Sequence, residues 1–357
     1  MVPIPAGAGV PSFEDYPSDD VADWPTRAFE FGKPPMGLDP VISRAFEDPA
    51  LSETRAVVVV HRGRLVAEAY GGELPSFTED PVKVDATTPL LSWSMAKSVL
   101  GIVVAQLADE GLIDLAEPLE VPEWPPGDPR CAITVDQTLE MRDGLDFAEE
   151  YTDLGPSDVI EMLFGSGQSD MASFAANHPL AHAPGAVFNY SSGTSNLLSR
   201  HVSLRLGGPD AIGTWLTERV FGPCSMHSAT VQFDDAGTFI ASSYLHATAL
   251  DFARLGLMLC RGGRANGHRV VPTRWVDRWR TPLSTDEDGH HYSAHFWCVG
   301  DEFGTFYLAG FEGQSITICP PLDLVIVRLG STPAERNDQL FDWRRQIIEL
   351  FAAQPRD

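Results

Sequence analysis

A lysine inside an apolar segment is the sequence feature that most restricts how this chain can fold. The 357-residue chain has three lysines, at positions 33, 83 and 97, against 22 arginines, and Lys97 lies in the mainly apolar segment 91–100. A buried ammonium group is costly unless it is paired or loses its proton, and lysine, unlike arginine, changes its pKa readily on burial. Lys97 is therefore a candidate base or a partner of one.

Ser94 stands three residues before Lys97, which gives the pattern Ser-x-x-Lys. Residues three apart share a helix face, and the apolar positions after Lys97 predict a helix that continues to about residue 112. Ser94 would begin this helix, where free N–H groups and the positive end of the dipole stabilise negative charge on its oxygen. The alternative is structural, with Ser94 capping the helix and Lys97 extending to the surface.

The composition indicates a globular protein with a sizeable core. Apolar residues make up 43% of the chain, which suits one large composite domain or two closely packed lobes. The formal net charge is −25, so we expect neither nucleic acid nor a membrane surface as a partner. No apolar run reaches membrane-spanning length, and the first residues lack the pattern of a signal peptide.

The five cysteines are scattered along the chain, odd in number and without a C-x-x-C pair. This usage is typical of reduced thiols in a reducing compartment, and it is unlike a disulfide scaffold or a zinc site. We therefore predict a cytoplasmic protein.

Strand patterns stand near both ends of the chain. Segments 55–60 and 65–70 are strand-like runs separated by a short Gly-containing turn, which indicates a hairpin. Four more runs follow near the C-terminus, as in an antiparallel meander, and a last helix is expected over 339–352. The four runs cover residues 292–299, 303–308, 315–319 and 324–329.

The middle of the chain is predicted to be mostly helical. Thr134 and Gln137 form a capping box before a helix at 138–142 that ends at Gly144. A capping threonine begins the helix predicted over 248–260. Two further helices are expected over 194–206 and 209–220.

This order of elements predicts an α/β (α+β) fold in which an antiparallel sheet is flanked by helices and a helical lobe is inserted. The sheet lobe would combine residues 51–114 with 231–357, and the helical lobe would cover 115–230. Residues 1–50, rich in Pro, Gly and Asp, would form an extended arm with a short helix near 40–46.

Tyr190 is a second candidate for the proton transfer that a nucleophilic serine requires. It lies between a Pro-Gly turn and the start of a helix. A lysine ammonium lowers the pKa of a nearby phenol, so a tyrosinate beside Lys97 is a plausible base. The structural alternative is a core aromatic residue whose hydroxyl bonds to the backbone.

Together these segments resemble the serine β-lactamase-like hydrolases, which include class C β-lactamases, D-alanyl-D-alanine carboxypeptidases, carboxylesterases and 6-aminohexanoate-oligomer hydrolases. The resemblance covers about residues 55–335 and implies a β-lactamase-like fold. It also implies Ser94 as nucleophile, with Lys97 and Tyr190 as a general-base pair that shares the proton transfer. The segments that carry it are the first hairpin, Ser94-Met95-Ala96-Lys97, 134–145, 184–192, 248–256 and 310–330.

Two motifs depart from the family's pattern. The second motif, often Tyr-x-Asn, is Tyr190-Ser191-Ser192 here, and the third, Lys-Thr-Gly or His-x-Gly on an edge strand, is matched by Phe311-Glu312-Gly313-Gln314. The cation that would hold a β-lactam or peptide carboxylate is missing, which favours the esterase and linear-amide hydrolase branch. Gly313 still allows close backbone approach, so the Gln314 N–H can join the Ser94 N–H as an oxyanion hole.

Substrate contacts are predicted for Gly313, for Tyr151, in an acidic loop that could reach over Ser94, and for Trp297. Core packing is the alternative for Tyr151 and Trp297. A metal site is not expected. His291 and His295 have helical spacing but lie where a strand begins, and segment 286–289 indicates a solvated turn rather than a calcium loop.

The sequence thus predicts a serine hydrolase that cleaves a small ester or linear amide through an acyl-enzyme on Ser94, with no cofactor. One alternative is a non-catalytic sensor that binds an acyl ligand and stays acylated. The other is β-lactamase or D-Ala-D-Ala carboxypeptidase activity.

Overall fold

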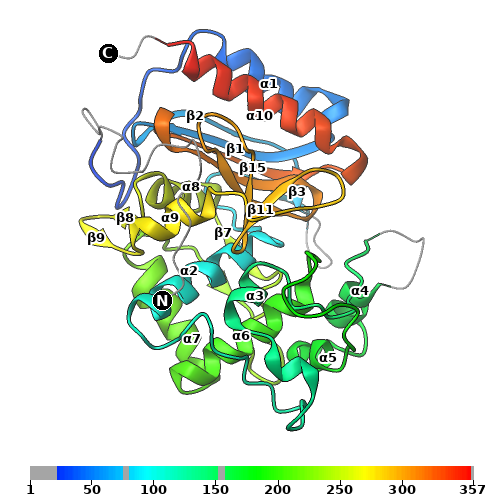
Figure 1. The fold of residues 1–357 in the computed structure, drawn as a ribbon. Coiled ribbons are helices and arrows are strands. Elements are labelled where there is room, and N and C mark those ends of the chain that lie inside the picture. The colour runs from blue at the N-terminus through cyan, green and yellow to red at the C-terminus, as the bar shows by residue number, and fades with distance from the viewer. Residues whose placement is uncertain (1–21, 75–79, 152–156, 355–357) are drawn as a thin grey trace.

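An antiparallel β-sheet forms the centre of the computed structural model, which describes residues 22–74, 80–151 and 157–354. In these residues the sheet has eight strands in the order β10-β11-β12-β13-β14-β15-β1-β2, and the two ends of the chain meet where β1 pairs with β15 (Figure 1). The strands are β1 (Glu53–His61), β2 (Arg64–Tyr70), β10 (Ser284–Thr285), β11 (His291–Ser293), β12 (Phe296–Cys298), β13 (Phe306–Gly310), β14 (Gln314–Cys319) and β15 (Leu324–Ser331).

The apolar run of β1 packs against helices on both faces of the sheet. Successive side chains of a strand point to opposite faces. Val57 and Val59 belong to the cluster formed with α1 (Leu38–Glu47) and α10 (Asn337–Ala352), whereas Val58 and Val60 belong to the core that contains α2 (Met95–Asp109) and α8 (Ala249–Cys260). All four valines are fully buried. A continuous apolar run therefore fits a strand with a helical layer on either side.

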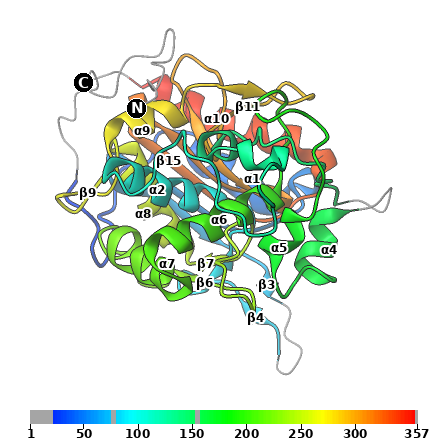
Figure 2. The same cartoon turned by 60° about the horizontal axis from the view of Figure 1, so that its bottom comes forward.

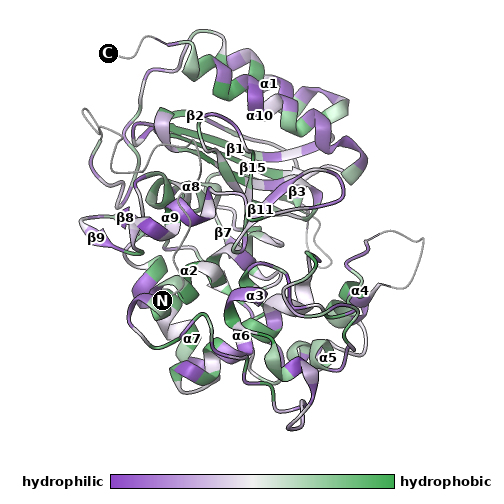
Figure 3. Ribbon diagram, viewed as in Figure 1, coloured by the Kyte–Doolittle hydropathy of each residue, from purple (hydrophilic) through white to green (hydrophobic). Residues whose placement is uncertain are grey.

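Helix α10 packs one face on the sheet. Its buried residues recur every three or four positions, and polar residues lie between them, so the helix carries alternating bands of hydropathy in Figure 3. Trp343 donates its Nε1 hydrogen to the carbonyl of Val41 at 2.9 Å, which ties α10 to α1. The buried residues of α10 are Leu340, Trp343, Arg344, Ile347, Ile348 and Phe351.

The remaining helices lie mainly on the other side of α2 from the sheet, and α6 runs through their middle (Figures 1 and 2). α6 contacts α2, α3, α4, α5 and α7, so its first turn is held close to the first turn of α2. The bounds are α3 (Val135–Leu139), α4 (Asp158–Phe164), α5 (Met171–Ala176), α6 (Ser192–Leu206), α7 (Pro209–Trp215) and α9 (Thr273–Trp279). Small sheets lie outside the central one. β3 (Glu73–Leu74) pairs with β4 (Val82–Lys83), β7 (Leu245–Ala247) lies between β5 (Leu90–Leu91) and β6 (Thr230–Val231), and β8 (Arg264–Ala265) pairs with β9 (His268–Arg269).

Most of the predicted elements are confirmed. The first hairpin is β1–β2, the helix after Ser94 is α2, and the last helix is α10. The helix predicted over 248–260 is α8, and the side chain of Thr248 caps it by accepting from the Asp251 N–H. The expected antiparallel sheet flanked by helices is present in the described residues.

Three predicted elements differ from the structure. The run 292–299 is not one strand but the hairpin β11–β12, because Ala294 and His295 adopt positive φ angles of 25° and 70°. The capping box at Thr134 is present, but its helix covers 135–139, and Met141, with φ of 55°, turns the chain away. The helix expected over 209–220 is α-helical only to Trp215 and continues to Phe221 in a wider, π-helical turn.

The described part of the predicted arm, residues 22–50, contains α1, which covers the short helix expected near 40–46. The proposed domain boundaries after residues 50, 114 and 230 stay predictions. Among the described residues, no helix is both long and apolar enough to cross a bilayer.

We expect Gly256→Ala to destabilise the fold, although alanine favours a helix over glycine. A Cβ atom at Gly256 in α8 would lie 2.5 Å from Val325 Cγ1 and 2.8 Å from Ile316 Cγ2, so the helix would have to move off the sheet. Overpacking of this kind costs about 1–3 kcal/mol. Thermal and urea unfolding measure the change.

Gly213→Ala in α7 is the matched control, because its Cβ would meet only the flexible ring of Phe233, at 3.3 Å. We expect it to keep or raise the free energy of unfolding. Equal stability of the Gly256→Ala protein and the wild type would contradict the close approach of α8 to the sheet.

Candidate active site

The turn before α2 places Ser94 at the start of the helix, where its side chain makes no capping hydrogen bond. Trp93 has a positive φ of 46°, a strained conformation for a large residue. The Ser92 N–H donates to the Leu245 carbonyl at 2.8 Å and holds the turn against β7. Ser94 is the N-cap residue of α2, yet its side chain accepts no capping hydrogen bond. The structural alternative, in which the Ser94 hydroxyl caps the helix by accepting a hydrogen bond, is therefore wrong.

Lys97 lies behind Ser94 and is enclosed by protein. Only 2% of it is exposed, so it does not extend to the surface. Its Nζ donates to Ser94 Oγ at 3.0 Å, to Ser192 Oγ at 2.9 Å and to the Ser242 carbonyl at 3.0 Å. Burial lowers the pKa of Lys97 to about 8, and the nearby charge of Glu149 opposes that fall. An appreciable fraction of the side chain is therefore neutral near pH 7 to 8.

Glu149 reaches this cluster through Ser192, the residue at the Asn position of the second motif. Ser192 donates its hydroxyl hydrogen to Glu149 Oε1 at 2.6 Å, and its backbone N–H donates to Oε2 at 2.7 Å. The carboxylate thus accepts from a free N–H at the start of α6, where negative charge is favoured. Tyr151 donates its hydroxyl hydrogen to the same Oε1 at 2.7 Å.

These contacts fix the direction in which Lys97 can receive a proton. The Ser242 carbonyl can only accept, and Ser192 has given its single hydroxyl hydrogen to Glu149. Both therefore take hydrogens from Lys97 and have none to offer. Ser94 is the one of the three partners with a hydrogen to give, so among them only Ser94 can transfer a proton to a neutral Lys97.

Tyr190 lies beside the same pair, with Lys97 Nζ 4.8 Å from its ring centroid. Burial raises the pKa of Tyr190 above its ordinary value, the charge of Glu149 raises it further, and a hydrogen bond with Ser94 opposes the rise. The sequence-based expectation that the lysine lowers this pKa is wrong in direction. The reason is that burial disfavours the charged phenolate and that the Glu149 carboxylate repels its negative charge. With its pKa raised, we expect Tyr190 to be a neutral phenol at neutral pH.

The third motif lies in a tight turn between β13 and β14, two interior strands, and not on an edge strand as the family pattern suggested. Glu312 and Gly313 have positive φ angles of 59° and 80°, and a Cβ at Gly313 would lie 2.4 Å from Leu340. Gln314 opens β14 opposite Gly310.

The side chain of Gln314 is hydrogen-bonded within the turn, so only the main-chain groups of Gln314 are available to the site. The side-chain Nε2 donates to the Phe311 carbonyl at 2.9 Å, and Oε1 accepts from the Gly330 N–H at 2.9 Å. Its partner Gly310 packs directly on the Ser94 turn, since a Cβ there would lie 2.2 Å from the Ser92 carbonyl. Among the described residues, no acceptor takes the Ser94 N–H. The turn and the helix start thus bring two main-chain segments against one cavity.

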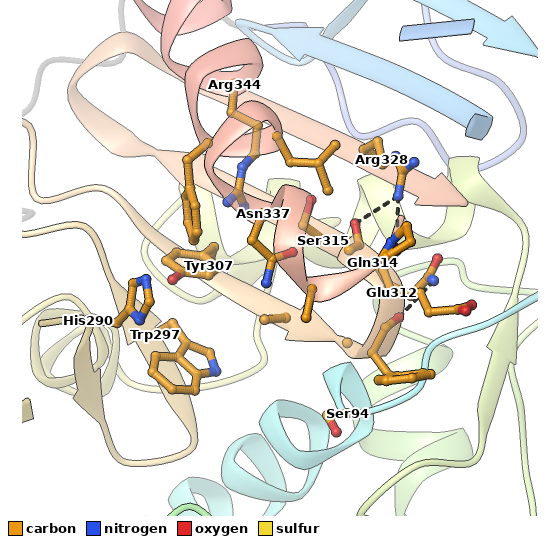
Figure 4. A pocket seen from close by; sticks show the side chains of 18 of the residues that line it. Ser94, His290, Trp297, Tyr307, Glu312, Gln314, Ser315, Arg328, Asn337 and Arg344 are labelled. Atoms are coloured by element: carbon orange, nitrogen blue, oxygen red, sulfur yellow. Dashed lines mark hydrogen bonds between the residues drawn. The ribbon is translucent and has the colours of Figure 1, made fainter. Parts of the chain in front are cut away.

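Ser94 opens into a cavity of about 460 Å³ that runs up between β13–β14 and α10 (Figure 4). Tyr151, Trp297 and Gly313, which were predicted as substrate contacts, all line it. Tyr151 stacks on Phe311 with ring centroids 4.6 Å apart, and Trp297 packs against Tyr190 at 5.4 Å. The walls next to Ser94 are therefore largely aromatic.

Several polar groups of the site were not identified from the sequence. Ser192 was noted only as a departure from the motif, and the main-chain carbonyl of Ser242 leaves no signal in a sequence. Glu149 lies two residues before Tyr151 in an acidic loop. A loop has no regular periodicity, so the sequence does not show which way the Glu149 side chain points. Arg344 also lines the cavity and was not singled out among the arginines of the chain.

His291 and His295, the two histidines weighed as metal ligands, each bond to another part of the protein, and His291 Nδ1 lies 2.9 Å from Thr285 Oγ1. His295 is buried, and its Nδ1 lies 2.9 Å from the Leu139 carbonyl. Asp286, Asp288 and His290 each bring one ligand atom within 4.8 Å of the others, in a turn whose backbone N–H groups already bond to Asp286.

The order of the motifs and the geometry of the site agree with the protein family that the chain matches. The Beta-lactamase family model matches residues 48–350. The chain belongs to the beta-lactamase family. A 6-aminohexanoate-dimer hydrolase of Paenarthrobacter ureafaciens is 29% identical over an alignment of 371 positions, which covers 92% of this chain and 90% of that protein.

Solved structures share the β-lactamase-like fold that was predicted. A Bacillus anthracis protein, provisionally identified as a 6-aminohexanoate-dimer hydrolase, has a TM-score of 0.77 at 22% identity, over 95% of this chain and 92% of that one. A family VIII carboxylesterase has a TM-score of 0.62 at 16% identity, over 87% and 96%. As a member of the beta-lactamase family, the chain is a serine hydrolase.

We expect Gly310→Ala to impair hydrolysis as well as to lower the free energy of unfolding. The added Cβ would collide with the rigid Ser92 carbonyl and push the β13–β14 turn away from Ser94. A displacement of about 1 Å in a catalytic site can cost about 100-fold in rate. Ester hydrolysis and thermal unfolding, measured on the same preparation, separate the two effects. Undiminished kcat in the folded variant would show that the turn is not part of the site.

Proposed function

We propose that this beta-lactamase family member cleaves small esters or linear amides through an acyl-enzyme on Ser94. The observation that carries the proposal is the cluster around Lys97. A buried lysine with a pKa of about 8 contacts Ser94 Oγ at 3.0 Å, and its other two partners can only accept hydrogen. A serine with such a neighbour meets the requirement of an activated nucleophile.

Acylation begins from the neutral amine of Lys97. Lys97 accepts the Ser94 hydroxyl proton while Ser94 Oγ bonds to the substrate carbonyl carbon, and the carbonyl π electrons move to oxygen. The oxyanion lies against the Ser94 and Gln314 N–H groups, which stabilise charge as it develops. Both donors are main-chain groups, so the loss of the family's usual third motif does not remove them.

Tyr190 supplies the proton for the leaving group. Its raised pKa keeps it protonated, and its position next to Lys97 and Ser94 brings the phenol near the bond that breaks. As the carbon–oxygen or carbon–nitrogen bond breaks, the leaving atom takes the Tyr190 proton, and the Lys97 ammonium returns one to Tyr190. Water then attacks the ester of Ser94 and gives its proton to the same relay, which releases the acid and restores Ser94.

Small linear substrates fit the site. The cavity of about 460 Å³ has aromatic walls near Ser94 and no lysine in the turn at 311–314. The 29% identical relative is a 6-aminohexanoate-dimer hydrolase, and one structural neighbour is a carboxylesterase. These names support the ester and linear-amide branch of the family for this chain.

We expect Ser94→Ala to abolish hydrolysis of 4-nitrophenyl acetate and butyrate, a loss of about 10³-fold or more. Intact mass spectrometry of the wild type during turnover should show a transient acyl adduct that the variant lacks. Ser98→Ala is the matched control, because Ser98 is a buried serine of the same helix whose hydroxyl bonds to the His295 carbonyl.

Each other outcome has a distinct meaning. Equal hydrolysis by wild type and Ser94→Ala would overturn the proposal. One burst followed by a stable adduct would favour the acyl-ligand sensor, and rapid hydrolysis of a chromogenic cephalosporin would favour β-lactamase activity.

The pH dependence of kcat/KM tests the state of Lys97. The neutral amine is the base, so activity should rise with pH through a midpoint of about 8, the pKa of Lys97. About a tenth of the lysine is neutral one pH unit below its pKa. Activity independent of pH between 6 and 9 would contradict this role.

Glu149→Gln should move that midpoint to lower pH. The Glu149 charge favours the ammonium form, so its removal lowers the pKa of Lys97 and more of the amine is neutral at a given pH. The maximal rate should fall, because an amide can turn its NH₂ toward Ser192 and release the hydroxyl hydrogen of Ser192. An unmoved or raised midpoint would show that Glu149 does not act on Lys97.

A further inference from the structure

A buried arginine lies behind the β13–β14 turn, which the proposed mechanism uses to bind the oxyanion. Arg328 extends from β15, and only 1% of it is exposed. Its Nη1 donates to the carbonyls of Glu312 and Gly313, at 3.1 and 3.3 Å, so the guanidinium binds the turn directly (Figure 4). The proposed mechanism gives this side chain no role.

The rest of the guanidinium is anchored to the chain around the central strands. Nη2 donates to the carbonyls of Leu51, at 3.2 Å, and Glu53, at 3.0 Å. It also donates to Thr332 Oγ1 at 2.6 Å, and Nε donates to Thr54 Oγ1 at 3.3 Å. One side of the Arg328 head is thus fixed to segments next to β1 and β15, and the other side is fixed to the turn.

Arg328 has no counterion within the described residues, where no carboxylate forms an ion pair with it. The buried Arg254, in contrast, pairs with Asp251 at 2.6 Å. Burying a charge is costly, and apolar residues in place of buried ionic groups often leave a protein equally or more stable. Stability of the fold therefore gives a weak reason for an arginine at this position, and the contacts of Arg328 point to the turn instead.

The turn has a backbone conformation that needs support. Glu312 and Gly313 have positive φ angles of 59° and 80°, and the left-handed region is unfavourable for a residue with a side chain, such as Glu312. A strained conformation persists only where its surroundings fix it. Here the Glu312 carbonyl accepts from Arg328 Nη1 and from the Thr332 N–H, the second at 3.0 Å.

The other end of the same turn contacts the segment that carries the nucleophile. A Cβ atom at Gly310, directly before the turn, would lie 2.2 Å from the Ser92 carbonyl, two residues before Ser94. Arg328 binds the turn two and three residues further along, at positions 312 and 313. A shift of the turn at the Arg328 end therefore changes its position relative to Ser94.

We propose that Arg328 is a positioning residue for hydrolysis, which holds the β13–β14 turn where its main chain can bind the oxyanion. This inference rests on the proposed function of Ser94 and adds a residue to it. Arg328 acts through the main chain of residues 312 and 313 rather than on the reacting atoms. Loss of its contacts should therefore weaken binding of the transition state more than binding of the substrate.

Arg328→Lys tests this role, because lysine keeps the charge but cannot reach both sets of carbonyls with one nitrogen. We expect kcat for 4-nitrophenyl acetate to fall about 10–100-fold while KM stays within about twofold, since a displacement of about 1 Å can cost about 100-fold in rate. Arg254→Lys is the matched control and should keep kcat. Arg254 is also buried and bonds to main-chain carbonyls, those of Pro25 and Arg27, but it does not line the cavity.

Two ketones separate oxyanion binding from a loss of folded protein. Ser94 Oγ adds to the carbonyl carbon of 1,1,1-trifluoro-4-phenylbutan-2-one and gives its proton to Lys97, so the ketone oxygen becomes an oxyanion. The matched 4-phenylbutan-2-one binds without this bond. Arg328→Lys should raise the inhibition constant of the trifluoromethyl ketone about 10–100-fold and leave that of the methyl ketone within about twofold.

Thr332→Val is a milder variant that keeps Arg328 in place. It removes the hydroxyl that accepts from Nη2, while the N–H of residue 332 can still bond to the Glu312 carbonyl. We expect kcat and the affinity for the trifluoromethyl ketone to fall by about 2–10-fold, the usual effect of one hydrogen bond. Thermal unfolding of each variant is measured alongside, and this variant decides the question if Arg328→Lys does not fold.

The outcomes distinguish this proposal from the one it rests on. Unchanged kcat and unchanged affinity for the trifluoromethyl ketone in the folded variants would overturn the positioning role alone. Equal losses for the two ketones would assign Arg328 to packing between the turn and the sheet, and would also overturn it. Activity that survives Ser94→Ala would overturn the proposed function itself.

Discussion

The burial of one ammonium group organises the site. Lys97 is stable at 2% exposure because three oxygens, from α2, from α6 and from the chain before β7, accept its hydrogens. Those segments are far apart in the sequence, so the lysine joins the helix next to the sheet to the helices beyond it. The same burial lowers its pKa to about 8, which is the property that the proposed mechanism requires of its base.

Glu149 shows how the site compensates for a changed motif. With serine at position 192, the side chain facing Lys97 is a hydroxyl that can both donate and accept. Glu149 removes the ambiguity by taking the hydroxyl hydrogen, so Ser192 can only accept from the lysine. The carboxylate also raises the pKa of Tyr190 and leaves that residue a proton donor. In the proposed mechanism, one carboxylate thus favours Lys97 as the proton acceptor and Tyr190 as the proton donor.

Local patterns explain why much of the fold could be predicted. The apolar run in β1, the capping box at Thr134 and the threonine cap of α8 each depend on a few adjacent residues, and each is present. The positive φ angles at Ala294 and His295, which split a predicted strand, have no glycine or asparagine to announce them. Ser94, Lys97 and Tyr190 could be placed from spacing and resemblance. Glu149 and Arg344 could not, because their positions depend on how loops and α10 pack against segments distant in the chain.

The most direct test of this account is the titration of Lys97 itself. The chain has three lysines, and Lys33 and Lys83 are exposed, so NMR of protein labelled with ¹³C and ¹⁵N at the lysine side chains gives few signals to assign. Lys97→Arg identifies the signal. We expect a midpoint near 8 for Lys97. A midpoint at or above the ordinary lysine value of about 10.4 would mean that the buried group stays an ammonium ion at neutral pH, and would contradict its role as the base.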